Sequence, residues 1–95
     1  FEVTIIERAP SIRPGGYAVD IRGAAISVLE RMGILDQVRT LDTKMTGVYF
    51  VNDEGQIKGQ LSEASLGNQQ GMDIEIMRED LCNILYDLTK DKVTY

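Results

Sequence analysis

The chain has 95 residues, enough for one domain at most, and its hydrophobic share of 43% supports a modest core. It has no histidine and one cysteine, Cys82, so histidine-based catalysis, a Cys/His metal site and an internal disulfide are excluded. The formal net charge of −5 disfavours nucleic acid or an anionic membrane as a partner. No apolar run approaches the ~20 residues of a membrane span, so we expect a soluble, cytoplasmic protein without stable membrane insertion.

The chain opens with a predicted strand followed by a loop. Val3 to Ile6 are a continuous run of β-branched residues, which is typical of a strand buried on both faces. Residues 9–17 contain both prolines and the pair Gly15-Gly16, so we expect a loop there. Glu7 would then lie where the strand enters the loop.

Two helices are predicted next. The first covers residues 23–32 and ends at Gly33, which occupies the place of a left-handed cap. Its apolar residues recur at helical spacing and should face the core: Ala25, Val28, Leu29 and Met32. A second short helix is expected over residues 34–41, with Leu35 and Val38 facing inward.

The middle of the chain predicts a β-hairpin. Residues 46–52 are rich in Val, Tyr and Phe, residues 56–61 form the return strand, and Asp53-Glu54-Gly55 form the turn. Tyr49 and Phe50 are interpreted as a core and a surface residue of this hairpin. We expect the hairpin to be the one antiparallel piece of the chain, followed by an exposed polar loop over residues 62–71.

The last third predicts a strand and a helix. Residues 73–77 alternate around Ile74 and Ile76, and residues 79–89 carry one apolar stripe, with Cys82 packed beside it. The stripe consists of Leu81, Ile84, Leu85 and Leu88. Strand, loop, helix, hairpin, helix and strand in this order indicate an α/β fold.

Both ends of the chain read as strands with nothing to pair against, at residues 1–7 and 92–95. Native small domains protect such edges with charge, proline or cover. The pattern therefore favours a segment of a longer protein. The alternative is a complete small α+β protein whose terminal strands pair with each other.

Glu7 is the first candidate for binding chemistry. At the carboxyl end of a strand in a dinucleotide-binding βαβ unit, a carboxylate accepts hydrogen bonds from ribose hydroxyls. The G-x-G-x-x-G turn that accompanies such an acid is absent from these 95 residues. The alternative interpretation is an ordinary solvated strand end.

Arg78 is the second candidate, because it is predicted at the amino end of the last helix, where the helix dipole disfavours a cation. Glu79 and Asp80 in the first turn already suit that dipole. An arginine beside free helix N–H groups makes a place for a phosphate. The alternative is a surface arginine paired with Glu75 or Asp80.

The glycine pair is the third candidate. Gly15 and Gly16 have no Cβ and let the backbone approach a ligand closely, and Asp20 and Arg22 add charge before the first helix. The alternative is a connecting loop in which Asp20 supplies the N-terminal charge of that helix.

The order of these segments resembles one family. The chain reads Val-Thr-Ile-Ile-Glu-Arg at 3–8, Arg-Pro-Gly-Gly at 13–16, Val-Asp-Ile-Arg-Gly at 19–23 and Val-Leu-Glu-Arg-Met-Gly-Ile-Leu at 28–35. Ile-Met-Arg-Glu-Asp-Leu at 76–81 matches the family's step of a hydrophobic residue, Arg, two residues and Leu into a helix. With this spacing, nearly the whole chain resembles the FAD-dependent aromatic-ring monooxygenases of the para-hydroxybenzoate hydroxylase type, especially their tetracycline-degrading relatives.

The resemblance implies that residues 1–95 are part of a Rossmann-like FAD-binding domain with an inserted antiparallel β-hairpin. The G-x-G-x-x-G unit would precede Phe1 and the substrate-binding part would follow Tyr95, so the remainder of its own chain would complete the site. The full protein would be an FAD- and NAD(P)H-dependent monooxygenase hydroxylating an aromatic or polyketide-like small molecule. The alternatives are a flavin-dependent halogenase or dehydrogenase of the same fold, and a non-enzymatic acidic domain that binds a protein partner.

The resemblance also implies cofactor-binding roles in the first predicted strand and loop. Glu7 would hold the adenosine ribose of FAD, and Arg8 would lie near the adenine and phosphate end. Arg13 would be on the loop that lines the cofactor and, in some relatives, the pyridine nucleotide.

Three further residues would lie closer to the flavin. Gly16 and Asp20 would be on the loop that passes by the flavin ring. Arg78 would reach the pyrophosphate or the ribityl chain of FAD, in agreement with its predicted place at the helix end.

Overall fold

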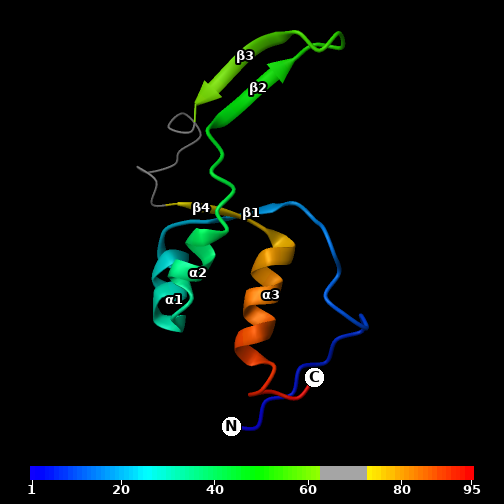
Figure 1. The fold of residues 1–95 in the computed structure, drawn as a ribbon, viewed down its shortest axis with the longest axis vertical. Helices are drawn as coiled ribbons and strands as arrows, with labels where there is room; N and C mark the ends of the chain where they lie inside the picture. The colour runs from blue at the N-terminus through cyan, green and yellow to red at the C-terminus, as the bar shows by residue number, and fades with distance from the viewer. Residues whose placement is uncertain (63–72) are drawn as a thin grey trace.

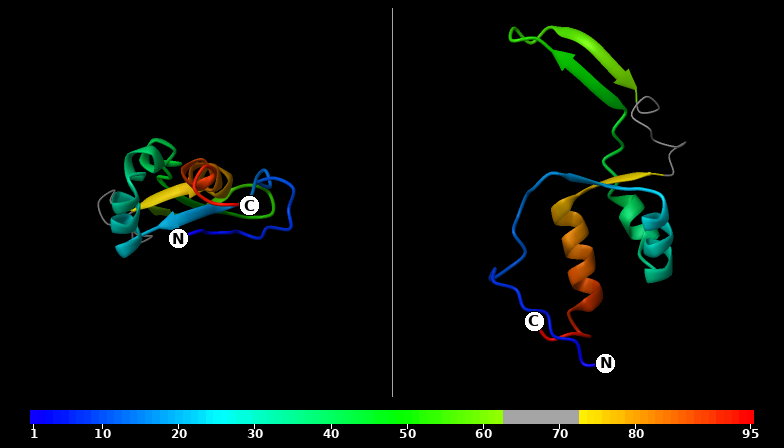
Figure 2. Two further views of the ribbon diagram at one scale, coloured as in Figure 1. Left: turned by 90° about the horizontal axis from the view of Figure 1, so that it is seen from below. Right: turned by 180° about the vertical axis from the view of Figure 1, so that it is seen from behind.

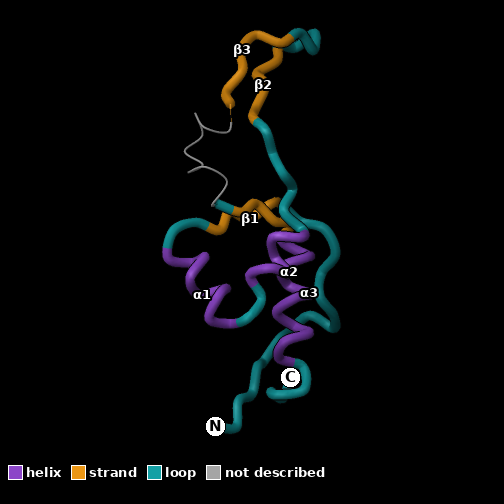
Figure 3. The backbone as a smooth tube through the Cα atoms, turned by 60° about the vertical axis from the view of Figure 1, so that its left-hand side comes forward, coloured by secondary structure: helices purple, strands orange, loops and turns teal. Residues whose placement is uncertain are grey.

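A computed structural model of the chain describes residues 1–62 and 73–95. The described elements are β1 (Ala18–Ile21), α1 (Ala24–Met32), α2 (Leu35–Thr40), β2 (Gly47–Val51), β3 (Ile57–Ser62), β4 (Ile74–Met77) and α3 (Arg78–Thr89). In Figure 1 the three helices lie on one side of the β1–β4 ribbon, and the β2–β3 hairpin extends from the other side. The backbone trace in Figure 3 shows the same arrangement from another direction. Apart from Ser62, the polar loop expected over residues 62–71 lies outside the described residues.

β1 and β4 form an antiparallel pair that the sequence pattern does not predict. Ala18 lies opposite Met77, and Ile21 lies opposite Ile74. The expectation that the hairpin would be the one antiparallel piece is therefore wrong. β1 has four residues, too few for a clear period-2 pattern, and its partner is far along the chain, so long-range pairing makes it a strand.

The hydrophobic core lies between the β1–β4 ribbon and the three helices. Its buried members come from β1, α1, the start of α2 and α2 itself, β4 and α3: Ile21, Leu29, Ile34, Val38, Ile74, Ile76 and Ile84. Val38 and Ile76 have no exposed surface. The stripe of α3 faces this core as predicted, with Ile84 buried and Leu81, Leu85 and Leu88 packed against it. The described residues include no buried polar or charged side chain.

The predicted inward face of α1 is only partly correct. Leu29 is buried, but Val28 and Met32 are 49% and 39% exposed. Ile26 packs against the core instead, one helical turn before Leu29. The apolar residues of α1 cover a wider arc than the core of this chain, so the sequence pattern alone does not show which part of the arc turns inward.

The predicted end of α1 is confirmed. Gly33 has φ 75° and ψ 20°, in the left-handed region that glycine adopts without a steric penalty. Its N–H donates to the carbonyl of Glu30 at 3.0 Å, and the N–H of Ile34 reaches the carbonyl of Leu29 at 3.1 Å. This turn places Ile34 in the core and begins α2 in the predicted place.

The two ends of the chain lie side by side (Figure 2). Thr4 and Thr94 form a parallel bridge, in which the N–H of Ile5 donates to the carbonyl of Thr94 at 2.7 Å and the N–H of Thr94 donates to that of Val3 at 3.0 Å. Parallel pairing across a helix is the connection used in α/β folds. The prediction that Val3 to Ile6 are buried on both faces is wrong, since Val3 and Ile6 are 47% and 96% exposed among the described residues.

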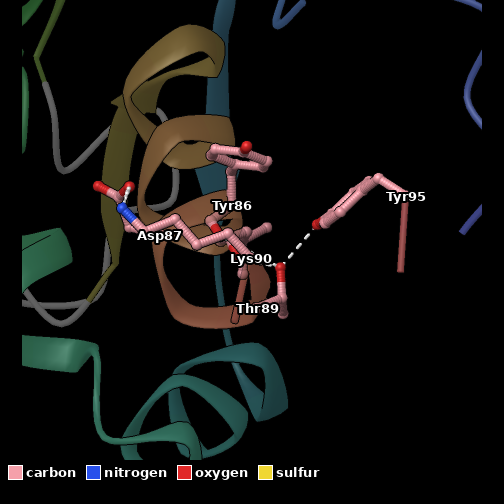
Figure 4. A network of polar contacts seen from close by, with 6 residues as sticks. Tyr86, Asp87, Thr89, Lys90 and Tyr95 are labelled. Atoms are coloured by element: carbon pink, nitrogen blue, oxygen red, sulfur yellow. Dashed lines mark hydrogen bonds and ion pairs between the residues drawn. The ribbon is translucent and has the colours of Figure 1, made fainter. Parts of the chain in front are cut away.

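The C-terminal end of α3 holds the last residues in place (Figure 4). The rings of Tyr86 and Tyr95 lie with their centroids 5.4 Å apart, and the hydroxyls of Thr89 and Tyr95 share a hydrogen bond of 2.7 Å. On the same turn, Lys90 Nζ donates to Asp87 Oδ1 at 3.1 Å, and this hydrogen bond raises the pKa of Lys90. α3 therefore positions Thr94 for its bridge to Thr4.

The hairpin is confirmed, but it has no core of its own. Asn52 organises its turn, because its Oδ1 accepts hydrogen bonds from the N–H groups of Glu54 and Gln56 at 3.1 and 2.8 Å. Tyr49 and Phe50 are 57% and 54% exposed, so the interpretation of Phe50 as a surface residue is confirmed and that of Tyr49 as a core residue is wrong. None of the described helices is long and apolar enough to cross a membrane.

Replacing Ile76 with Ala should lower the free energy of unfolding by about 2–4 kcal/mol, because the change leaves a cavity in a fully buried position. Ile57→Ala is the matched control, since the same side chain is 63% exposed there. We expect the control to cost less than about 1 kcal/mol. Urea denaturation followed by circular dichroism measures both values. Equal losses would show that Ile76 is not a core residue.

Candidate functional site

The candidate site lies where the loop of residues 9–17 meets the first turn of α3. β1 follows this loop directly, and β4 leads directly into α3. Because Ala18 is paired with Met77, Tyr17 lies next to Arg78, whose N–H donates to the carbonyl of Tyr17 at 3.1 Å. Strand pairing thus brings together two segments that are far apart in the sequence.

The guanidinium group of Arg78 faces the loop. Its Nη2 donates to the carbonyl of Arg13 at 3.0 Å and to the carbonyl of Gly15. Its Nη1 contacts Cys82 Sγ, one turn further along α3, at 3.9 Å. Its Nε is buried and has no hydrogen-bond partner among the described residues. Arg78 therefore keeps Nε as an unused donor, while Nη2 holds the loop and Nη1 contacts α3.

The alternative partners expected for Arg78 are not the ones that it contacts. Within residues 1–62 and 73–95, no ion pair joins it to Glu75 or Asp80. The carboxylate of Glu75 instead accepts a hydrogen bond from the hydroxyl of Thr43. The interpretation of Arg78 as a surface ion pair is therefore wrong, and the cation is directed at backbone carbonyls.

Gly16 is required by the close approach of Arg78. Its φ is 114°, a conformation that residues with a Cβ rarely adopt. A Cβ on Gly16 would lie within 3.0 Å of three guanidinium atoms of Arg78. Gly15 also has a positive φ, of 71°, but a Cβ there would meet nothing within 4 Å. The backbone at Gly16 thus leaves the space that the guanidinium group fills.

Glu79 holds the same loop from the other side. The N–H of Gly15 donates to Glu79 Oε2 at 2.5 Å. The sequence pattern does not single out Glu79 for this contact, since it predicts only a favourable charge in the first helical turn. No local signal could reveal the contact, because the two residues are 64 positions apart.

Glu7 and Arg8 lie at the far end of the loop from Arg78. Both are exposed, and Glu7 Oε1 accepts a hydrogen bond from the N–H of Ala9 at 2.8 Å. Glu7 Oε2 has no hydrogen-bond partner within the described part of the chain. No interaction among the described residues joins Glu7 or Arg8 to Arg78.

Asp20 lies on a strand and not on the loop where it was expected. It is in β1, opposite Glu75 of β4, and its carboxylate is 3.4 Å from Arg22 Nη2. Arg22 Nε is also 3.7 Å from Asp73. The expectation that Asp20 supplies the N-terminal charge of α1 is wrong, because α1 begins at Ala24 and has no acidic residue in its first turn.

The structure thus brings together three of the six predicted site residues, namely Arg13, Gly16 and Arg78, and places the other three elsewhere along the loop and β1. A separate pocket at the turn between α1 and α2 is lined by Glu30, Gly33, Leu35 and Asp36 and includes none of the six. Among residues 1–62 and 73–95, no cluster of three or more acidic or cysteine side chains could hold a metal ion.

Comparison with known proteins shows similarity over the whole chain. An uncharacterized protein of Mycobacterium tuberculosis strain H37Rv is 40% identical over 97 residues, which cover 100% of this chain and 26% of that protein. An FAD-dependent monooxygenase of Sarocladium schorii is 38% identical over 98 residues, which cover 99% of this chain and 23% of that protein. No family model matches the chain.

A solved structure gives the same result. The crystal structure of tetracycline destructase Tet(51) superposes with a TM-score of 0.76 at 35% sequence identity, covering 99% of this chain and 22% of that one. The chain therefore spans about a quarter of the length of the relatives that it matches. The resemblance indicated by the sequence is confirmed: residues 1–95 are a segment of the FAD-dependent monooxygenase family.

Proposed function

We propose that this chain is part of the FAD-binding domain of an FAD- and NAD(P)H-dependent monooxygenase that hydroxylates an aromatic or polyketide-like small molecule. The observation that carries the proposal is likeness along 99% of the chain, in sequence to an FAD-dependent monooxygenase and in fold to a tetracycline destructase. The likeness to a tetracycline destructase supports a polyketide-like substrate class. A cytoplasmic location is part of the same proposal.

The residues of the candidate site fit a cofactor such as FAD. Arg78 Nε is a buried donor without a partner in the described chain, and such a donor favours an acceptor from outside it. Glu7 is exposed and uses only one carboxylate oxygen, which leaves the other free for a ribose hydroxyl. Gly16 keeps side-chain bulk away from the backbone beside Arg78. These three features suit an anionic ligand that carries a sugar.

Each residue has a definite task in this proposal. Glu7 would accept hydrogen bonds from the adenosine ribose, and Arg8 would lie near the adenine and phosphate end. Arg78 would offset the negative charge of the pyrophosphate or bind the ribityl chain. FAD, when bound and reduced, supplies the activation of O2 that amino-acid side chains cannot provide.

Three further residues complete the proposed set. Arg13 uses its backbone carbonyl to hold Arg78, while its side chain is exposed and free to contact the cofactor or the pyridine nucleotide. Gly16 would keep the loop close to the flavin. Asp20 would act from β1, immediately after the loop.

The fold proposal is a Rossmann-like domain with an inserted hairpin. The parallel bridge between Thr4 and Thr94, with α3 leading into its second strand, is compatible with a βαβ crossover. In this proposal the remainder of its own chain supplies the G-x-G-x-x-G unit and most of the substrate-binding surface. A halogenase or dehydrogenase of the same fold would use the same segment. The similarity to named enzymes favours all of these over a non-enzymatic interaction domain.

Arg78→Ala and Glu7→Ala should each weaken FAD binding by the full-length protein about tenfold or more, because each removes a charged hydrogen-bonding group. Titration of FAD into the apoprotein, followed by flavin fluorescence, measures the affinity. The matched controls are Arg31→Ala and Glu2→Ala, which remove exposed residues of the same charge. We expect the controls to stay within about twofold of wild type. Unchanged affinity in both site variants would reject the assigned roles.

Gly16→Ala should destabilise the protein more than Gly15→Ala, by about 1–2 kcal/mol, because the new methyl group displaces the Arg78 guanidinium group from its two carbonyls. Both glycines have a positive φ, of 71° and 114°, so Gly15→Ala controls for part of the backbone strain, which is larger at Gly16. The same two changes in an Arg78→Ala background complete a double-mutant cycle. There, the additional destabilisation by Gly16→Ala over Gly15→Ala should be smaller. An excess of equal size in both backgrounds would show that Gly16 is needed only for its backbone conformation.

A further inference from the structure

The peptide groups of Gly15 are held from both sides by two consecutive residues of α3. Its carbonyl accepts a hydrogen bond from Arg78 Nη2, and its N–H donates to Glu79 Oε2 at 2.5 Å. Both partners are charged, and hydrogen bonds to charged groups are among the strongest in proteins. Gly15 has no side chain, so these contacts fix the loop through its backbone alone.

The loop needs such an attachment because of its composition. Gly15 and Gly16 both have a positive φ and, without Cβ atoms, can adopt many other conformations at similar energy. Any rotation at Gly15 would also move Gly16, against which Arg78 packs, and the carbonyl of Arg13, to which Arg78 donates. The orientation of Arg78 therefore depends on how Gly15 is held.

We propose that Glu79 is a positioning residue for cofactor binding. Its carboxylate fixes the N–H of Gly15, and this keeps the carbonyls of Arg13 and Gly15 turned toward Arg78. The guanidinium group is then held in one orientation against Gly16, with Nε buried and unpaired among the described residues. Glu79 itself does not touch the cofactor. This inference rests on the proposed function, because it specifies how the Arg78 site is kept in its binding geometry.

Asp80 separates this role from a simple effect of charge. Glu79 and Asp80 are both acidic residues in the first turn of α3, so both interact favourably with the helix dipole. Glu79 contacts the loop, whereas no hydrogen bond or ion pair of Asp80 is found among the described residues. Replacing either residue removes the same charge from the helix end, but only Glu79 should affect Gly15.

The test compares Glu79→Ala, Glu79→Gln and Asp80→Ala in the full-length protein. Glu79→Ala should raise the Kd for FAD about tenfold, the effect expected for the loss of one hydrogen bond to a charged group. Glu79→Gln keeps an acceptor oxygen and should recover most of the affinity. The Kd of Asp80→Ala for FAD should stay within about twofold of wild type.

Two readouts distinguish positioning from stability. At saturating FAD, the visible circular dichroism of the bound flavin should change in Glu79→Ala but not in Asp80→Ala. Hydrogen exchange at the Gly15 amide should be about tenfold faster or more in Glu79→Ala alone. If the wild type binds FAD but Glu79→Ala and Asp80→Ala have equal affinities and spectra, the inference is overturned and the proposed function is not. A full-length wild type that binds no flavin would overturn the proposed function and the inference with it.

Discussion

The antiparallel pairing of β1 with β4 is the constraint on which the candidate site depends. It places the end of the glycine-containing loop beside the first turn of α3 and lets Arg78 reach two carbonyls that are more than 60 residues away in sequence. The same pairing buries Ile21, Ile74 and Ile76 in the core. Core packing and site geometry therefore share one structural cause, so a change that weakens the strand pair would disturb both.

The sequence predicts most local elements of this fold correctly. The presence of α1 and α3, the left-handed end of α1 and the turn of the hairpin depend on residues close together in the chain, and such signals can be read directly. β1 could not be predicted, because a four-residue strand becomes a strand only through its distant partner. The contact of Glu79 with Gly15 was hidden for the same reason.

Part of the candidate site could also be predicted from the sequence. The conflict between the positive charge of Arg78 and the helix dipole drew attention to this side chain, which binds two loop carbonyls, while its role toward a phosphate stays a prediction. The loop partners of Arg78 could not be inferred, because every residue has a backbone carbonyl and the sequence does not indicate which of them is bound. The exposed positions of Val28, Met32 and Tyr49 show a related limit. Apolar spacing indicates that a face can be buried, but not which segment covers it.

α3 contacts the N-terminal half of the chain at both of its ends. At its C-terminal end, Tyr86 and Thr89 hold Tyr95, next to the residue that bridges to Thr4, and at its N-terminal end Arg78 and Glu79 hold Gly15. Residues 5–15 therefore form a loop whose two ends are both anchored through α3. Insertions and deletions within residues 9–12 would change only the length of this loop, because its two anchored ends would stay in place. Among homologues, length variation should accumulate in that span, while the spacing between Gly15 and β1 stays constant.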